Sequence, residues 1–235
     1  MKSRAFMLIA LAGIFWGTSP FFVGHFVPHG FSSLQMTSSA TAVVLMYTAP
    51  VIVMVYSVLF FGERMTKLKF VALVAMLIGC CLVAGVISGL KFNLLGIAFG
   101  ALSGISYSAY NIITKISMSR GAHPVTATFY AFLCAAILSV FISKPAGIIE
   151  NISGDVWRVL PMIFLFGIAT CILPYFLYTV GIRDLPAGTA TSLGIIEPMA
   201  ATVLSAVFLN QMPDVFSIIG VVLILGVIAL LGRQE

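Results

Sequence analysis

Long apolar runs follow one another along this chain, separated by short polar breaks, and they constrain the fold more than any other feature. A membrane hydrocarbon core of roughly 30 Å needs about 20 apolar residues for one helical crossing. Of the 235 residues, 61% are apolar and only 8% are charged, which is more apolar surface than a water-soluble domain can bury. The excess must face lipid, and the length leaves room for about eight crossings and no separate soluble domain.

The runs are continuously apolar rather than alternating. Because lipid offers backbone groups no partner except along a helix, we expect helices and not strands. The predicted helices cover residues 6–27, 38–61, 70–88, 93–114, 124–142, 157–181, 187–209 and 215–232. The predicted fold class is therefore an all-α membrane protein with about eight transmembrane helices.

Basic residues predict the orientation, because cytoplasmic loops retain Lys and Arg. Eight crossings from an inside N-terminus put three basic residues outside and nine inside. The nine are Lys2, Arg4, Arg64, Lys67, Lys69, Lys115, Arg120, Arg183 and Arg233. We therefore expect a multi-pass protein of the plasma (inner) membrane with both termini in the cytoplasm. The first run continues to Val27, so we interpret it as an uncleaved helix and not as a signal peptide.

Several functions are disfavoured by the sequence. The 12 basic residues are scattered singly and form no patch, so we expect no nucleic-acid partner. His25, His29 and His123 have no carboxylate or cysteine placed to complete a metal site. There is no phosphate-binding loop and no catalytic constellation. We expect no metal, no cofactor and no enzyme activity.

The chain contains an internal repeat. The stretch from Thr41 to Leu82 aligns without a gap on residues 189–230, an offset of 148 that pairs Pro50 with Pro198. A weaker match aligns the glycines of the first helix with those of the fourth at an offset of 87. Just beyond it, Gly30 pairs with Gly121 at an offset of 91.

The change of offset locates a loss in the first half. The second half carries 148 − 91 = 57 residues that the first half lacks, which is enough for two crossings of about 20 residues each and their turn. We therefore predict a shortened first repeat of three helices in residues 1–91 and a second repeat of five helices in residues 92–235. Since both numbers are odd, the repeat is inverted in the membrane.

Three local patterns carry a resemblance to a known family: Phe15-Trp16-Gly17, the stretch from Pro50 that ends in Gly62-Glu63-Arg64, and Glu197-Pro198 followed by Phe208-Leu209-Asn210. The chain resembles the EamA-type members of the drug/metabolite transporter superfamily. The resemblance implies ten helices as an inverted pair of five-helix halves, and a permease for small molecules. This chain departs from that design, because a connector around residues 28–37 replaces the second and third helices.

Glu197 is the strongest candidate for a substrate or proton site. It is the only carboxylate well inside an apolar run, where an unpaired ion costs several kcal/mol, and intramembrane carboxylates are functional by default. The alternative is structural: Glu197 hydrogen-bonds to a neighbouring helix and only fixes the packing. The sequence leaves both open.

Four further residues are candidates for the substrate site. Trp16, Tyr107, Tyr110 and Asn111 lie in the first and fourth helices, and aromatic groups there could line a cavity for amphipathic or cationic solutes. Core packing or an interfacial belt is the alternative for the aromatic residues.

Glycines and prolines within the runs predict local structure. Gly96, Gly100 and Gly104 repeat at a spacing of four, which lays them on one helix face and predicts close packing against another helix. Pro50, Pro174 and Pro198 lie inside predicted crossings and are expected to kink them.

Two functional interpretations remain. The first is a secondary transporter that exports metabolites, amino acids or drug-like compounds by alternating access between the halves. The second is a truncated, non-transporting membrane protein or a helix-bundle partner of other membrane chains, because the missing helices would open one wall of a shared cavity to lipid. A homodimer could close that wall.

Overall fold

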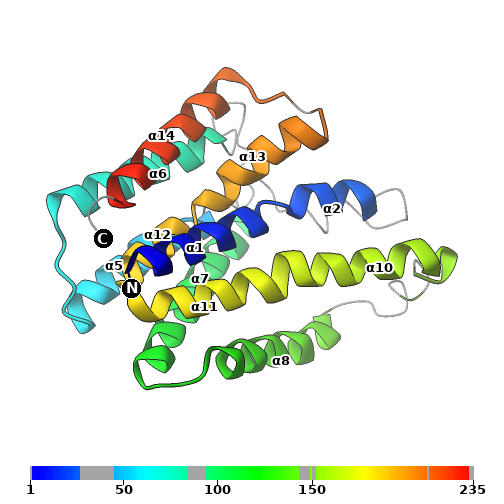
Figure 1. Cartoon of the computed structure of the whole chain (residues 1–235), viewed down its shortest axis with the longest axis horizontal. Coiled ribbons are helices and arrows are strands. Elements are labelled where there is room, and N and C mark those ends of the chain that lie inside the picture. The colour runs from blue at the N-terminus through cyan, green and yellow to red at the C-terminus, as the bar shows by residue number, and fades with distance from the viewer. Residues whose placement is uncertain are drawn as a thin grey trace.

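The computed structural model describes residues 2–26, 45–83, 94–142, 149, 152–210 and 212–232, and these residues form helices without any strand (Figure 1). The helices, in chain order, are α1 Lys2–Trp16, α2 Ser19–Phe26, α5 Ala49–Phe60, α6 Lys67–Val83, α7 Leu94–Ser119, α8 Pro124–Ile142, α10 Val156–Phe166, the π-helix η3 Gly167–Ile172, α11 Leu173–Asp184, α12 Ala187–Leu193, α13 Ile196–Phe208 and α14 Val215–Gly232.

Helix length and exposed apolar surface both indicate a membrane protein. Four stretches of the described residues are long and apolar enough to cross a membrane: Lys2–Phe22, Pro124–Phe141, Val156–Asp184 and Ala187–Phe208. Two shorter apolar helices, Ala49–Phe60 and Val215–Leu230, accompany them. Large apolar side chains such as Phe141 point outward, which is favourable only in lipid. The chain is therefore an all-α membrane protein, and the number of crossings stays a prediction.

The helices agree with the predicted ranges. Each of the eight ranges contains a helix, and α8 and α14 begin and end at the predicted residues. The predicted boundary between the halves at residues 91 and 92, and the connector at 28–37, lie outside the described residues.

Several predicted crossings are interrupted rather than continuous. Gly17 and Thr18 separate α1 from α2, Gly194 and Ile195 separate α12 from α13, and a turn at residues 47–48 precedes α5. A proline lies in the first turn of the helix after each break: Pro20, Pro50 and Pro198. Proline has no N–H to donate to the preceding turn, but it fits the first turn of a new helix. These prolines therefore explain where the helices restart.

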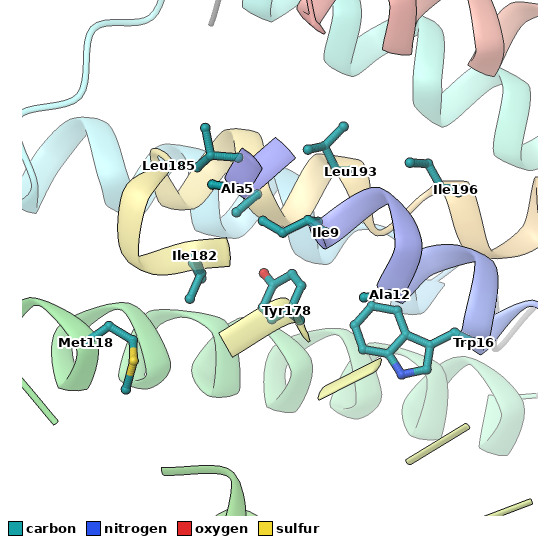
Figure 2. Close-up of a cluster of buried hydrophobic side chains, with 11 residues drawn as sticks. Ala5, Ile9, Ala12, Trp16, Met118, Tyr178, Ile182, Leu185, Leu193 and Ile196 are labelled. Carbon is teal, nitrogen blue, oxygen red and sulfur yellow. The ribbon is translucent and has the colours of Figure 1, made fainter. Parts of the chain in front are cut away.

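The main core forms around α1. This helix lies beside α11 along most of its length and also contacts α12 and α13. Buried side chains from these helices gather into one cluster, which Figure 2 shows with Ile9 of α1 near Tyr178 of α11. A Cβ atom at Gly181 would lie 2.6 Å from Ile9 Cγ1, so only a glycine lets the two helices approach this closely.

A second core joins the helices that end the two predicted repeats. Figure 1 shows α6 and α14 side by side, and they contact each other extensively. Gly79 and Gly220 form the closest approach, since a Cβ atom at Gly220 would lie 2.6 Å from the Gly79 carbonyl oxygen. Met76 and Ile224 are fully buried in the same contact.

The two ends of the molecule differ in charge. Figure 1 places the start of α1, the end of α14, and the α5–α6, α7–α8 and α11–α12 connections on one side. Eight of the nine basic residues predicted to face the cytoplasm are described, and they lie in these segments or in the helix turns next to them. The opposite end carries Arg158 of the start of α10 and the acidic residues Asp155 and Asp214.

Candidate functional site

Glu197 lies at a helix break near the centre of the molecule. It is the second residue of α13, and its backbone N–H donates to the Gly194 carbonyl oxygen across the break, with an N–O distance of 3.0 Å. Its surroundings are largely buried, and the whole of α12 on the other side of the break is buried. Glu197 itself is partly exposed, and a carboxyl group here must be satisfied by protein groups, by water or by a ligand, because lipid cannot do so.

The Glu197 carboxyl group has a side-chain partner in Tyr47. Tyr47 belongs to the turn before α5, is 3% exposed, and its hydroxyl group hydrogen-bonds the Glu197 carboxyl group. Thr48, the last residue of the turn before α5, precedes Ala49, and Ile196, the first residue of α13, precedes Glu197. Because Tyr47 contacts Glu197, the two helix breaks lie next to each other.

Helix α1 packs directly on this centre through two glycines. A Cβ atom at Gly13 would lie 2.8 Å from Ile196 Cβ, and one at Gly17 would lie 2.5 Å from Ala200 Cβ and 2.9 Å from the Glu197 carbonyl oxygen. Larger residues would push α1 away from α13. The sequence thus fixes the distance between the first helix and Glu197.

Aromatic rings line the side of this centre formed by α1, α7 and α11. The ring of Trp16 lies 5.1 Å from that of Tyr175 and 5.7 Å from that of Tyr178, measured between centroids. The ring of Tyr110 lies 5.5 Å from that of Tyr175. Edge-to-face contacts of this kind stabilise a packed aromatic cluster.

Tyr107 connects the aromatic cluster to the Glu197 break. Its hydroxyl oxygen lies 3.0 Å from the position that a Cβ atom of Gly194 would occupy. Tyr107 and Tyr175 are both near enough to Glu197 to interact with it electrostatically. Four of the five predicted site residues, Trp16, Tyr107, Tyr110 and Glu197, therefore surround one centre.

Asn111, the fifth predicted residue, is already occupied by protein groups. Its amide nitrogen donates to the Tyr107 carbonyl oxygen at 2.6 Å, and its amide oxygen accepts a hydrogen bond from the Tyr178 hydroxyl group. Tyr178 also lies 3.3 Å from the Thr191 hydroxyl oxygen. Asn111 is fully buried, so its amide links α7 to α11.

Some buried polar atoms have no partner among the described residues. They are the Trp16 indole nitrogen, the Ser57 hydroxyl, the Tyr110 hydroxyl and the Thr189 hydroxyl. A buried donor or acceptor left unpaired costs about 1–3 kcal/mol. Trp16 and Tyr110 both contact Tyr175, so two of these atoms belong to the aromatic cluster.

The predicted packing glycines have different environments. Gly104 lies against the break before α5, where a Cβ atom would be 2.7 Å from the Leu45 carbonyl oxygen. Gly100 is buried, and the surroundings of Gly96 lie outside the described residues. Among the described residues, no group of three or more His, Cys, Asp or Glu residues could hold a metal ion.

Sequence reasoning missed Tyr47, Tyr175 and Tyr178. Each lies within or beside an apolar run, where a tyrosine hydroxyl must find a partner, and this is the signal that could have found them. What the sequence could not show is that α11 lies beside α1, which brings Tyr175 and Tyr178 to Trp16.

At the basic end, two side chains tie neighbouring elements together. The Glu63 carboxylate accepts a hydrogen bond from the Ala187 backbone N–H at 2.6 Å, at the first residue of α12. The Lys115 ammonium group donates to the carbonyl oxygens of Ile182 and Leu185, at 2.8 and 2.5 Å. Carboxylates are favourable at helix N-termini and cations at C-termini, so both contacts suit the helix ends that they cap.

Glu197 lines none of the clearest surface hollows found among the described residues. One is an apolar groove that includes Phe15, Thr18 and Phe22 beside Phe208 of α13. A more polar hollow lies between α13 and α14 and is lined in part by Thr202, Ser205 and Asp214. The aromatic rings beside Glu197 contact one another, and the Glu197 side chain itself stays partly exposed.

Comparison with known proteins places the chain among transporters. The sequence profile of the EamA-like transporter family matches residues 29–85 and 94–233. An uncharacterized transporter of Archaeoglobus fulgidus is 28% identical over 205 residues, which are 86% of this chain and 70% of the relative. The uncharacterized transporter YwfM of Bacillus subtilis is 25% identical over 235 residues, 96% of this chain and 73% of the relative.

A third relative and a solved structure complete the comparison. An uncharacterized transporter of Clostridium kluyveri is 27% identical over 203 residues, 82% of this chain but only 63% of the relative. This chain therefore spans about two thirds of the length of its relatives. One crystal structure superposes on the whole chain and on 92% of its own, with a TM-score of 0.68 at 18% identity, and so shares the fold.

Proposed function

Because the chain belongs to the EamA-like transporter family, we propose that it moves small organic molecules across the membrane as a secondary transporter, by alternating access of one central site to the two sides. The proposal adds the mechanism and the location of the site to what the family establishes, which is a multi-pass membrane transporter. The substrates are metabolites, amino acids or drug-like compounds, and the direction is export.

One observation carries the proposal: two helix breaks from the two predicted repeats meet at the Tyr47–Glu197 hydrogen bond. Inverted-repeat transporters bind their substrates near the midplane, where discontinuous helices leave polar groups and backbone ends free. The described residues around Glu197 form such a centre, and substrate would bind there by opening the contacts among the surrounding aromatic rings.

The contacts at the basic end support a closed state on that side. Glu63 and Lys115 join the α5–α6 loop and α7 to the connection between α11 and α12. In an alternating-access cycle these contacts must break before substrate can enter from that side. We propose that the basic end faces the cytoplasm of an inner membrane, so this conformation is closed to the cytoplasm.

A labelling experiment tests the orientation. Single cysteines replace Arg64 and Asp214 in a background that lacks the four native cysteines, and intact cells are treated with a membrane-impermeant maleimide. We expect labelling of the cysteine at position 214 and protection of the one at position 64 until the cells are lysed. The reverse pattern contradicts the proposed orientation.

Efflux from cells tests transport itself. Cells that make the chain, its Glu197→Gln variant or its Asp155→Asn variant are loaded with a panel of amino acids and toxic organic cations, after equal membrane insertion is confirmed. Asp155 lies outside the helices, 38% exposed at its side chain, and serves as the matched control carboxylate. Faster efflux that Glu197→Gln abolishes and Asp155→Asn preserves is the expected result. No efflux of any panel member from the inserted chain would favour the truncated, non-transporting alternative.

A further inference from the structure

The charge balance of the central site points to one class of substrate. Among the described residues, Glu197 is the only carboxyl group in the buried centre, and no Lys, Arg or His side chain pairs with it there. The described basic side chains lie at or near the ends of their helices. When Glu197 is ionised, a bound cation is therefore the group that can neutralise it, whereas an anionic ligand would add a second uncompensated charge.

The walls of the site also suit a cation. Tyr47 contacts Glu197 directly, and Tyr107 and Tyr175 lie within its electrostatic reach. Trp16 and Tyr110 extend this surface around the Tyr175 ring. The faces of tyrosine and tryptophan rings attract organic ammonium groups, and the attraction is strongest where water is excluded. A surface of five aromatic residues beside a single carboxyl group thus matches an ammonium ligand.

Trp16 adds a second requirement. The indole is 7% exposed, and no acceptor among the described residues lies within hydrogen-bond distance of its nitrogen. An indole N–H donates and cannot accept, so its missing partner is an acceptor oxygen or nitrogen. A ligand with such an atom would satisfy a donor that the protein leaves buried and unpaired.

Building on the proposed transport function, we propose that the substrate is an organic monocation that also carries a hydrogen-bond acceptor. Its ammonium group binds at the Glu197 carboxylate in place of the Tyr47 hydroxyl group. Its apolar part lies against Tyr107 and Tyr175, and its acceptor takes the Trp16 N–H. Glu197 sets the preference for positive charge, and Trp16 sets the preference for an acceptor.

Exchange assays on the purified full chain in phospholipid vesicles test the charge requirement. The labelled probes are acetylcholine, which is a cation with an ester acceptor, and hexyltrimethylammonium, a cation of similar size without one. Neutral 3,3-dimethylbutyl acetate and anionic hexanoate serve as competitors. We expect both cations to exchange, and neither competitor to inhibit at concentrations where unlabelled acetylcholine does.

Variants separate the two roles. Glu197→Gln should slow exchange of both cations at least about tenfold, because the quaternary ammonium group loses its ion pair with the carboxylate in a site of low polarity. Glu197→Asp keeps the charge and should retain part of the exchange, and Asp155→Asn should leave it unchanged. The chain should prefer acetylcholine over hexyltrimethylammonium by about fivefold, and Trp16→Phe should bring this ratio to about one, since the removed donor is a neutral hydrogen bond.

Two different results would contradict the proposed substrate class and the proposed transport function. If the vesicles exchange labelled amino acids or neutral compounds but neither cation, or if the neutral isostere competes as well as acetylcholine, the substrate class is wrong while transport stands. If no labelled amino acid, cation or neutral compound exchanges in vesicles where the folded chain is verified, the proposed function itself fails.

Discussion

Gly62 and Asn210 both hold a left-handed backbone, with φ values of 66° and 53°, and they are 148 residues apart. Each follows one of two helices, α5 and α13, whose sequences align at that same offset. Both helices also end with the same cap, in which the next residue's backbone N–H donates to a serine carbonyl oxygen at 3.0 Å. The matched termini support the internal repeat in backbone conformation as well as in sequence.

This pair gives a first prediction. Left-handed backbone costs non-glycine residues about 1–2 kcal/mol, and asparagine tolerates it better than most. Gly62→Ala should therefore lower the thermal unfolding midpoint in detergent, Gly62→Asn should lower it less, and Asn210→Gly should leave it equal or higher. Gly226→Ala, in an open helical position, is the control. Equal effects of the alanine and asparagine substitutions at position 62 would contradict the backbone explanation.

The approach of α1 to α13 gives a second prediction. Gly17→Ala places a Cβ atom 2.5 Å from Ala200 Cβ, and overpacking of this kind costs about 1–3 kcal/mol. It should lower both stability and transport, because Gly17 also faces the Glu197 backbone. Gly226→Ala meets no atom within 4 Å, so it should leave transport unchanged and should keep or raise stability, since alanine favours a helix more than glycine does. Thermal unfolding and efflux, measured on the same preparations, check the pair.

The bond between Asn111 and Tyr178 gives a third. Since both ends of the Asn111 amide are paired with protein groups, we expect Asn111→Leu to act mainly through stability. A double-mutant cycle with Tyr178→Phe should show a coupling energy of about 0.6 kcal/mol, the average for hydrogen bonds between membrane helices, and at most about 1.7 kcal/mol. Additive losses would mean that the two residues act independently, and Asn111 would return to the list of substrate ligands.

Glu63 gives a fourth prediction, at the basic end. Glu63→Ala removes the acceptor of the Ala187 N–H, and losing a cap of this kind costs about 0.5–2 kcal/mol. The variant should be less stable, and α12 should be accessible from the basic end of the molecule for a larger fraction of the time. A cysteine introduced at Ala190, which is buried in α12, should then react faster with a small thiol reagent than it does beside intact Glu63. Arg64→Ala, at an exposed neighbouring position, should not change the rate.

Much of the fold follows from apolar run length alone. The ends of α8 and α14 coincide with changes from apolar to polar sequence, and lipid enforces helices between them. Helix breaks were harder to predict, because Gly194 and Ile195 are as apolar as their neighbours. The prolines in the first turn after each break were visible, but a proline can also kink a helix without ending it.

One register in the repeat differs from the sequence alignment. A Cβ atom at Gly13 would meet Ile196, and one at Gly104 would meet Thr48. Thr48 and Ile196 are 148 residues apart, so these two contacts relate Gly13 to Gly104 at an offset of 91, although the nearest atom to Gly104 is the Leu45 carbonyl oxygen; the offset of 87 stays a prediction. The glycines of both helices recur every four residues, so a slip of one helical turn still places glycine on glycine, and sequence alone could not resolve it.

The next contact along the same helices also fits an offset of 91. Gly17 approaches the Glu197 carbonyl oxygen, and the hydroxyl group of Ser108, which is 91 residues further on, lies 3.5 Å from the Ala49 carbonyl oxygen. Ala49 is the predicted repeat partner of Glu197. The backbone contacts around these two residues therefore resemble each other, whereas only Glu197 carries a carboxyl group.

The packing of α1 beside α11 has a consequence for how the chain is made. Ribosomes add about 5–20 residues per second, so Trp16 is synthesised roughly 10 to 30 s before the end of α11 at Asp184. During that interval the first helix lacks the neighbour that covers most of its length, and lipid, the insertion machinery or later helices must shield Ala5, Ile9 and Ala12. The order of synthesis thus places insertion of α1 well before that of α11, so α1 is among the last of the described helices to reach its final contacts.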